Sequence, residues 1–485
     1  MRAKPRCPRS RSQAADMSRN GCGQEGPRLY EPVRTMPKVY LESLGCPKNR
    51  VDSEIMLGLA VQQGAEIVSE PDSADVVVVN TCGFIDAAKR ESIDTILELA
   101  QWKAGAAHRR LIVTGCLVQR YGDELAQALP EVDAFLGTGD FQRLPELLAA
   151  TSYPRSAAYR GAAHVLPDVK LPRVRTGEFF SAYLKVSEGC DHRCSFCIIP
   201  KIRGRHESRS LDSVLAEAEQ LVQDGVVEIN LVAQDLTAYG RDRRDGTTLA
   251  RLLRELARIR ELKWIRLLYN YPRYVTDDLL HVIAEEEKVC SYIDMPLQHA
   301  STRILRAMRR ERDGEQLRLL LARIRALVPG VAIRTSFIVG FPGETEEDFR
   351  TLLDFVREQR FERVGVFTYS REEGTPAAEL PHQVPATVKR RRYRELMRVQ
   401  AEIAAEHQRS QVGKTLPVLV CGQDHRGRWF GRTETQAPEI DGVVYLTEPA
   451  PVGQVIPVRI VGASTYDLRG TPLLDVSVDT KPLGI

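Results

Sequence analysis

The sequence predicts an α/β protein with three folded parts: a doubly wound parallel sheet, a partial βα barrel and a small antiparallel β-barrel. The length of 485 residues allows about three domains. Apolar strands alternate with amphipathic helices over most of the chain, which is typical of parallel sheets. After residue 411 the pattern changes to short Val-rich strands separated by Gly and Pro turns, as in small antiparallel barrels.

The composition excludes several classes of protein. Hydrophobic residues make up 43% and charged residues 27%, as in ordinary globular proteins. We find no uncharged apolar run near the roughly 18 residues that a membrane span needs, so we expect no membrane partner. The net charge is +3, but residues 1–35 carry +5 and the rest carries −2. Bulk charge therefore does not predict strong binding to nucleic acid.

Residues 1–35 are rich in Arg, Pro, Gly and Ser and have no periodicity. We predict a disordered tail or a mis-assigned start, with a targeting peptide as the alternative. The chain has ten cysteines, and we identify no secretory signal before them. We therefore expect a cytoplasmic, reducing compartment in which thiols serve as metal ligands rather than forming disulfides.

The first folded domain is predicted over residues 36–150. Its candidate strands KVYLESLG, DVVVVNT and RRLIVTG are apolar on both faces, and helices are expected after them at about 52–63, 87–102 and 122–128. Cys46, Cys82 and Cys116 each follow one of these strands directly. Because ligands bind beyond the carboxyl ends of parallel strands, the three thiols should converge on one edge of the sheet.

A second and longer series is predicted over residues 180–410, after a Pro-rich linker at 151–179. Its candidate strands are AYLKVSE, VVEINLVA, WIRLLYN, VCSYIDM, VAIRTSFIVG and RVGVFTYS. Six βα units predict a partial barrel, since a closed one needs eight, and the open side would admit a bulky substrate. Residues 386–410 are predicted to form a basic helical connector. Residues 411–485 form the small barrel, with a net charge of −1.

The strongest motif is Cys190-x3-Cys194-x2-Cys197, at the end of the first strand of the second series. Three thiolates in a tight loop can hold three irons of a 4Fe-4S cluster and leave the fourth iron open to another ligand. Zinc, which usually takes four ligands, and a plain buried loop are the alternatives. His192 lies inside this loop, and we expect it to be exposed to solvent.

This spacing, with Phe196 before the last cysteine, resembles the radical S-adenosylmethionine superfamily. The resemblance implies that S-adenosylmethionine binds the open iron and is cleaved to a 5′-deoxyadenosyl radical, which removes hydrogen from unactivated carbon. The segment IVGFPGE, residues 338–344, is similar to the one that supports the adenine in that family; a simple strand-to-helix turn is the alternative. Strand-end residues Gln234 and Asp235 are weaker cofactor candidates, and Asp235 could instead be a helix cap. The candidate cofactor-binding residues are Phe196, Gln234, Asp235, Gly340, Gly343 and Glu344.

Singly, the three strand-end cysteines would be ordinary buried thiols, but their equivalent placement favours a second 4Fe-4S cluster with an open iron. From residue 36 to its end the chain resembles the methylthiotransferase family, with an N-terminal cluster domain, a radical S-adenosylmethionine core and a C-terminal TRAM barrel. The resemblance implies two 4Fe-4S clusters, S-adenosylmethionine as cofactor, and insertion of a CH3S group at a C–H position. The implied metal ligands are Cys46, Cys82 and Cys116 for one cluster and Cys190, Cys194 and Cys197 for the other.

Four short motifs are similar to the branch of this family that modifies the β-carbon of an aspartate in small-subunit ribosomal protein twelve. They are GCPKN at 45–49, NTCGFI at 80–85, SEGC at 187–190 and AQD at 233–235. The tRNA branch typically has Gln-Met-Asn after the first cysteine and Gln-Asn in place of Gln234-Asp235. The weakly acidic barrel agrees with a basic protein substrate.

The expected partners are therefore this ribosomal protein, free or in the ribosome, and an electron donor such as flavodoxin or ferredoxin. Nucleic acid is not expected as the primary substrate. Two alternatives stay open, namely a tRNA N6-isopentenyladenosine methylthiotransferase and a non-catalytic iron–sulfur scaffold or electron carrier.

The remaining motifs have plainer interpretations. Cys290 and Cys421 lie within apolar strands and are predicted to be core thiols, whereas Cys7 and Cys22 fall in the tail. The run KRRR at 389–392 could contact ribosomal RNA, but a solvated helix face is the usual role of such a run.

Overall fold

The computed structural model describes residues 36–150, 157–159, 161 and 171–473. The predicted tail, with Cys7 and Cys22, lies outside the described residues. The sheets described below belong to one compact unit, residues 37–485.

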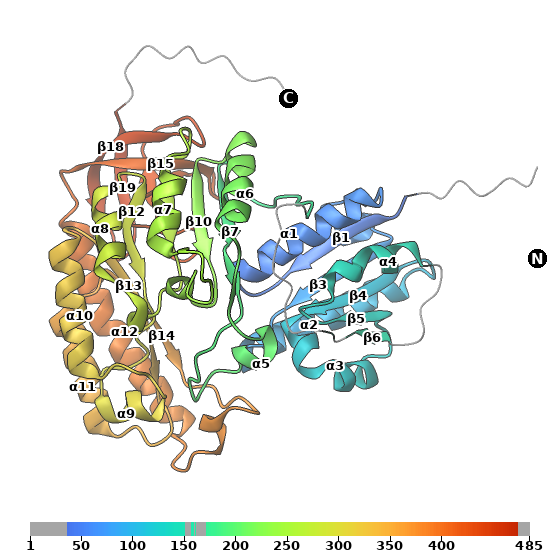
Figure 1. Ribbon diagram of the computed structural model, residues 1–485, viewed down its shortest axis with the longest axis horizontal. Coiled ribbons are helices and arrows are strands. Elements are labelled where there is room, and N and C mark those ends of the chain that lie inside the picture. The colour runs from blue at the N-terminus through green and yellow to red at the C-terminus, as the bar shows by residue number, and fades with distance from the viewer. Residues whose placement is uncertain (1–35, 151–156, 160, 162–170, 474–485) are drawn as a thin grey trace, which may run out of the picture. The chain divides into compact units, whose positions relative to one another are not determined.

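The N-terminal sheet is entirely parallel and has the strand order β2-β1-β3-β4-β5-β6 (Figure 1). Side chains of its strands alternate between two cores: Val76 and Val78 pack with α1 and α4, and Val77 and Val79 pack with α2 and α3. Helices on both faces confirm the predicted doubly wound sheet. Its elements are β1 (Lys38–Ser43), α1 (Pro47–Gln62), β2 (Glu66–Ile67), β3 (Val76–Thr81), α2 (Asp86–Ala104), β4 (Arg110–Gly115), α3 (Cys116–Ala128), β5 (Ala134–Leu136), α4 (Leu144–Ala149) and β6 (Ala157–Tyr159).

Two helices of this sheet begin earlier than the sequence predicts. Helix α1 starts at Pro47 rather than near residue 52, because proline suits the first helical position and the polar residues Asn49 and Asp52 are buried rather than solvated. Helix α3 starts at Cys116 rather than near residue 122, with a kink at Tyr121 that interrupts its periodicity. The predicted linker also contributes a short strand, β6, which pairs with β5.

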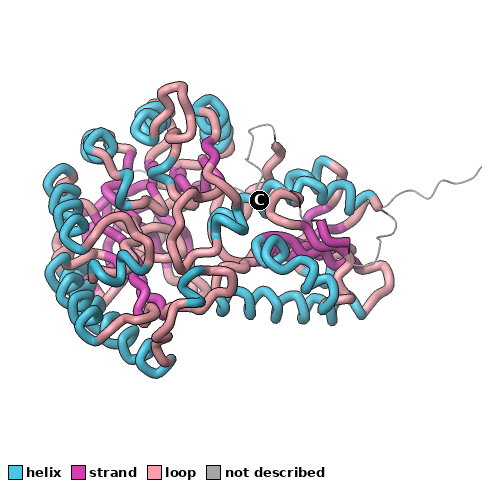
Figure 2. Tube along the Cα trace, turned by 60° about the horizontal axis from the view of Figure 1, so that its bottom comes forward, coloured by secondary structure: helices cyan, strands magenta, loops and turns pink. Residues whose placement is uncertain are grey.

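The central sheet is also parallel, in the order β14-β13-β12-β11-β10-β7, and its six open strands confirm the predicted partial barrel. Figure 2 shows helices along the outside of these strands. The strands are β7 (Ser181–Lys185), β10 (Glu228–Val232), β11 (Trp264–Leu267), β12 (Val289–Asp294), β13 (Ala332–Val339) and β14 (Arg363–Thr368), and a small ladder joins β8 (Ser187–Glu188) to β9 (Glu207–Ser208). The helices are α5 (Ile199–Arg203), α6 (Leu211–Gln223), α7 (Leu249–Ala257), α8 (Asp277–Glu285), α9 (Thr302–Ala307), α10 (Gly314–Leu327), α11 (Glu346–Gln359) and α12 (Ala386–Arg409).

Helix α12 is more than the predicted connector, because it packs against β14 and α11. In the run 389–392, Arg392 is buried and pairs with Glu344, and Lys389 is half-buried with its ammonium on the Tyr369 carbonyl. The expectation of a solvated face is therefore wrong for these two residues. Arg390 and Arg391 are exposed, as expected.

The C-terminal strands close into a barrel in the order β15-β16-β17-β19-β18. Its neighbours are antiparallel except β17 and β19, which run parallel because β18 intervenes between them in the chain. The strands are β15 (Thr415–Gln423), β16 (Trp429–Thr433), β17 (Val444–Leu446), β18 (Val455–Ala463) and β19 (Leu468–Pro472). Among the described residues, no helix has the length and apolar character needed to span a membrane.

Candidate active site

The structure brings Cys46, Cys82 and Cys116 together at the carboxyl edge of the N-terminal sheet. A Cβ placed on Gly45, whose φ is +94°, would lie 2.8 Å from the Cys82 Cβ, so the turn before Cys46 rests directly on Cys82. Burial, together with the neighbouring Cys116 and Cys46 thiols, raises the pKa of the Cys82 thiol to about 12. The Cys82 thiol is therefore protonated without metal, and metal binding must displace its proton.

Cys116 is the most enclosed of these three thiols. It packs with Ile198 and Ile202, which follow Cys197 in the chain, and its Sγ accepts hydrogen bonds from the Arg203 guanidinium at 3.3 and 3.4 Å. The surroundings of this thiol thus come partly from the central segment.

Cys190, Cys194 and Cys197 form the second thiol group, in a loop between β8 and α5. Gly189 has φ +76°, and a Cβ there would lie 1.9 Å from the Arg205 carbonyl oxygen, so only glycine fits this turn. The Cys190 N–H donates to the Gly204 carbonyl at 3.1 Å, and the Cys197 N–H donates to the Cys194 carbonyl at 3.2 Å. Burial raises the pKa of the Cys190 thiol to about 12.

In the described part of the chain, no three His, Cys, Asp or Glu side chains are close enough to share one metal ion. A 4Fe-4S cluster takes one thiolate per iron, so its ligands lie farther apart than those of a single ion. Three thiols on separate strand ends, and three on one loop, suit a cluster in this respect.

His192 is not exposed, contrary to the sequence-based expectation. Its side chain is only 10% exposed, its Nε2 lies 2.7 Å from Asp235 Oδ2, and its ring stacks on Tyr271 at 3.6 Å between centroids. The loop folds over the carboxyl ends of β10 and β11, which are followed by Asp235 and Tyr271 respectively. Asp235 also accepts a hydrogen bond from the Ala238 N–H, so it does act as a helix cap.

Gln234 and Glu188 meet beside the second thiol group. The amide of Gln234 donates to the Glu188 carboxylate, whereas its buried Oε1 has no hydrogen-bond partner among the described residues. An unpaired buried carbonyl of this kind is a candidate for contact with a bound ligand.

The buried side chain of Glu344 holds the turn at 338–344 in place through hydrogen bonds to its backbone. Its carboxylate accepts hydrogen bonds from the N–H groups of Gly340 and Phe341, at 2.6 and 3.0 Å, and pairs with Arg392 at 2.9 Å. Burial raises the pKa of Glu344 to about 7. Gly340 and Gly343 have φ of +74° and +78°, as a tight turn requires. Glu344 therefore positions the turn backbone.

Phe196 connects this turn to the cysteine loop, because it packs in one apolar cluster with Phe341 and Tyr369. The Ser195 N–H also donates to the Met308 carbonyl at 3.0 Å. The two segments that the sequence suggests for the cofactor are thus adjacent, and Gln234 and Asp235 lie at the end of the neighbouring strand β10.

Several charged residues of the site escape sequence analysis: Lys185, Glu188, Arg203, Arg310 and Arg392. Glu188 and Arg203 had a usable signal, because Glu188 lies two residues before Cys190 and Arg203 follows Cys197 by six residues. The predicted core thiol Cys290 is buried in β12, and Cys421 is half-buried in β15.

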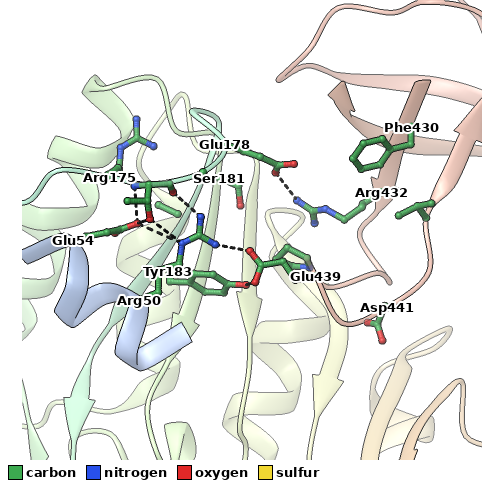
Figure 3. A pocket seen from close by; sticks show the side chains of 15 residues that line it. Arg50, Glu54, Arg175, Glu178, Ser181, Tyr183, Phe430, Arg432, Glu439 and Asp441 are labelled. Atoms are coloured by element: carbon green, nitrogen blue, oxygen red, sulfur yellow. Dashed lines mark hydrogen bonds and ion pairs between the residues drawn. The ribbon is translucent and has the colours of Figure 1, made fainter. Parts of the chain in front are cut away.

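Two cavities lie where α1 meets the C-terminal barrel. One of about 370 Å³ is lined by Cys46, and a second of about 380 Å³ shares with it Arg50, Thr176 and Glu439. Figure 3 shows the second cavity, in which the Arg50 guanidinium donates to the Thr176 carbonyl at 2.7 Å and to Glu439. Cys46 therefore faces a polar space beside the barrel.

Comparison with known proteins assigns a family to this arrangement. Three family models match the chain: the uncharacterized protein family UPF0004 over residues 38–137, the radical SAM superfamily over residues 184–356 and the TRAM domain over residues 412–473. The solved structure of the radical S-adenosylmethionine methyltransferase TsrM from Kitasatospora setae is similar in fold, with a TM-score of 0.50 and 16% identity, over 70% of this chain and 76% of that chain.

Curated relatives are similar over nearly their whole length. The chain is 51% identical over 437 residues to the ribosomal protein uS12 methylthiotransferase RimO of Geotalea uraniireducens, and 52% identical over 437 residues to that of Geobacter sulfurreducens. In both comparisons the match covers 89% of this chain and 98% of the relative. The chain therefore belongs to the RimO family of methylthiotransferases, within the radical SAM superfamily, whose enzymes use a 4Fe-4S cluster and S-adenosylmethionine.

Proposed function

We propose that this enzyme replaces a hydrogen on the β-carbon of an aspartate in ribosomal protein uS12, small-subunit ribosomal protein twelve, with a methylthio group. The proposal rests on two groups of three cysteines at strand ends, in a chain that shares about half of its residues with RimO proteins over nearly all of its folded length. We further propose cytoplasmic action, with flavodoxin or ferredoxin as the electron donor.

The two thiol groups have separate roles in this proposal. Cys190, Cys194 and Cys197 hold the cluster that binds S-adenosylmethionine, and Cys46, Cys82 and Cys116 hold a second cluster that carries the sulfur to be inserted. When bound, the two clusters and S-adenosylmethionine would supply an electron, a 5′-deoxyadenosyl radical that removes the substrate hydrogen as an atom, and the sulfur that replaces it, with the methyl group on that sulfur taken from a second S-adenosylmethionine.

Residues of the protein set the backbone conformation and the charge around both thiol groups. Positive-φ glycines directly before Cys46 and Cys190 let the chain turn tightly where these two cysteines begin their segments. The buried cations Arg203 and Arg310 lie at one sulfur of each group and offset the negative charge that deprotonated thiols bring.

Glu344 holds the backbone of the turn that supports the adenine, and the free carbonyl of Gln234 is available to the bound cofactor. No general base is required, because hydrogen leaves as an atom. The open side of the six-stranded barrel gives room for a protein substrate.

Two triple variants test the proposal. Anaerobically reconstituted protein should bind about eight irons per chain, and replacing either cysteine group with alanine should leave about four. Alanine at 190, 194 and 197 should abolish formation of 5′-deoxyadenosine. Alanine at 46, 82 and 116 should preserve that product but abolish methylthiolation of uS12, detected by mass spectrometry. The matched control, alanine at Cys290 and Cys421, should change neither iron content nor product.

Sulfur insertion by the variant with alanine at 46, 82 and 116 would refute the role of the second cluster. The substrate is tested separately in a deletion strain, by mass analysis of uS12 and of tRNA nucleosides. Unmodified uS12 with normal tRNA is expected, and normal uS12 with altered tRNA would overturn the assignment.

A further inference from the structure

Arg203 joins the two thiol groups in a way that the sequence order does not suggest. It ends helix α5, six residues after Cys197, yet it donates to the sulfur of Cys116 in the other group. The contacts come from Nε at 3.4 Å and Nη2 at 3.3 Å, so one edge of the guanidinium faces the sulfur.

The opposite part of the same guanidinium is held by carboxylates. Nη1 lies 2.7 Å from Asp52 Oδ2 and 3.3 Å from Glu188 Oε2, and Nη2 also donates to the Asn49 side chain. Asp52 and Asn49 belong to α1, just after Cys46, whereas Glu188 lies two residues before Cys190. Side chains from both segments therefore fix the orientation of the guanidinium.

The surrounding charges are balanced and buried. Lys185 pairs with the same two carboxylates, at 2.6 Å from Glu188 Oε2, and every side chain of the four is at most 5% exposed. The two cations balance the two anions, which makes their burial tolerable, and the N–H groups of Arg203 that face the Cys116 sulfur would face the negative charge of a cluster there. Burial makes this interaction stronger than it would be at the surface.

We propose that Arg203 is a positioning residue that raises the reduction potential of the cluster held by Cys46, Cys82 and Cys116, an inference that rests on the second cluster of the proposed function. Reduction adds negative charge to the cluster and its sulfurs. Hydrogen bonds and positive charge at a ligating sulfur stabilise the reduced form and so raise the potential. Arg310, at 3.6 Å from the Cys194 sulfur, provides a matched comparison at the other cluster.

The test measures midpoint potentials by redox titration followed by electron paramagnetic resonance. The background variant has alanine at 190, 194 and 197, so that only the N-terminal cluster gives a signal. Into it we introduce Arg203→Lys and Arg203→Gln, with Arg310→Gln as the matched control. The potential should fall for Arg203→Gln, fall less for Arg203→Lys, which keeps the charge but loses the planar fork, and stay unchanged for Arg310→Gln.

The opposite cysteine background distinguishes the effects of the two arginines on the two clusters. In protein with alanine at 46, 82 and 116, Arg310→Gln should lower the potential of the remaining cluster and Arg203→Gln should not. Iron content and circular dichroism establish that each variant is folded and loaded. Should Arg203→Gln not fold, because it leaves Asp52 and Glu188 with one cation, Arg203→Lys decides alone.

An unchanged potential in a loaded Arg203→Lys or Arg203→Gln variant would overturn the inference. Equal shifts from Arg203→Gln and Arg310→Gln in one background would also overturn it, since the effect would then be general. Absence of any cluster signal in the first background, before Arg203 is changed, would instead refute the second cluster and with it the proposed function.

Discussion

Replacing Arg432 with Gln should destabilise the protein substantially, although the residue belongs to the C-terminal barrel and lies far in sequence from both groups of three cysteines. Arg432 lies on β16 of the C-terminal barrel, and its guanidinium reaches the buried carboxylate of Glu228 on β10, at 2.6 and 3.0 Å. The same carboxylate accepts from Arg266 at 3.0 Å and from the Ser181 hydroxyl at 2.7 Å. The substitution removes two of these four hydrogen bonds and one of two countercharges.

The expected loss in free energy of unfolding is about 3 kcal/mol. Removing one partner of a buried ion pair costs about 3–5 kcal/mol, because the remaining charge is left uncompensated. Arg266 still pairs with Glu228 after the change, which places the cost at the lower end of that range. The exposed Arg459 on β18 is a matched control, and Arg459→Gln should cost no more than about 0.5 kcal/mol.

The pH dependence of this loss has a defined sign. Burial raises the pKa of Glu228, but the charges of Arg432 and Arg266 outweigh burial and hold it well below its usual range. A carboxylate with a depressed folded-state pKa stabilises the protein above its unfolded pKa and loses that contribution as pH falls. The difference in free energy of unfolding between wild type and Arg432→Gln should therefore be largest at pH 7 and should decrease below about pH 4.5.

Urea unfolding followed by tryptophan fluorescence measures the difference, since Trp264 and Trp429 lie on strands beside the pair. If Arg432→Gln and Arg459→Gln unfolded at the same urea concentration at pH 7, the ion pair would carry no net stability. A difference that widened as pH fell would contradict the assigned charge of Glu228.

Three further substitutions test local features. Gly45→Ala should lower the free energy of unfolding by about 2 kcal/mol and reduce the iron bound beside Cys82, because the new Cβ would lie 2.8 Å from the Cys82 Cβ. Gly225 also has a positive φ but lies in open space, so Gly225→Ala should lower the free energy of unfolding by only about 1 kcal/mol, through backbone strain. Equal effects of the two substitutions would contradict the steric argument. Gln234→Leu should weaken S-adenosylmethionine binding about tenfold in equilibrium dialysis through one lost hydrogen bond, and an unchanged Kd would exclude that contact. Arg391→Ala, in an exposed pair on α12, should leave the urea concentration at the midpoint of unfolding nearly unchanged, and a clear decrease would contradict its exposed position.

The gathering of Cys46, Cys82 and Cys116 was predictable because the geometry of a parallel sheet brings strand ends together whatever their separation in the chain. The loop of Cys190 was predictable from spacing alone. In contrast, His192 sits in a polar loop and gives no sign of burial, because its partners Asp235 and Tyr271 arrive from two other strand ends.

Ion pairs and hydrogen bonds between residues far apart in the sequence could not be predicted from it either. Arg203 lies 87 residues from Cys116, and Arg432 lies 204 residues from Glu228. An arginine that pairs inside the protein has the same sequence signature as one on the surface, as the run at 389–392 illustrates. Two of its four residues turn inward and support the turn at Glu344.

The open edges of the central barrel give a physical reason for the positions of helices α1 and α12. Its two edge strands, β7 and β14, expose unpaired backbone groups unless another element covers them. Helix α12 packs against β14, and α1 packs against β7, where Lys185 meets Asp52. Because α1 begins directly after Cys46 and β7 leads to Cys190, the contact that protects the edge also fixes one thiol group relative to the other. Closing the barrel with further strands would remove the need for this contact, and with it the contact that fixes the two thiol groups relative to each other.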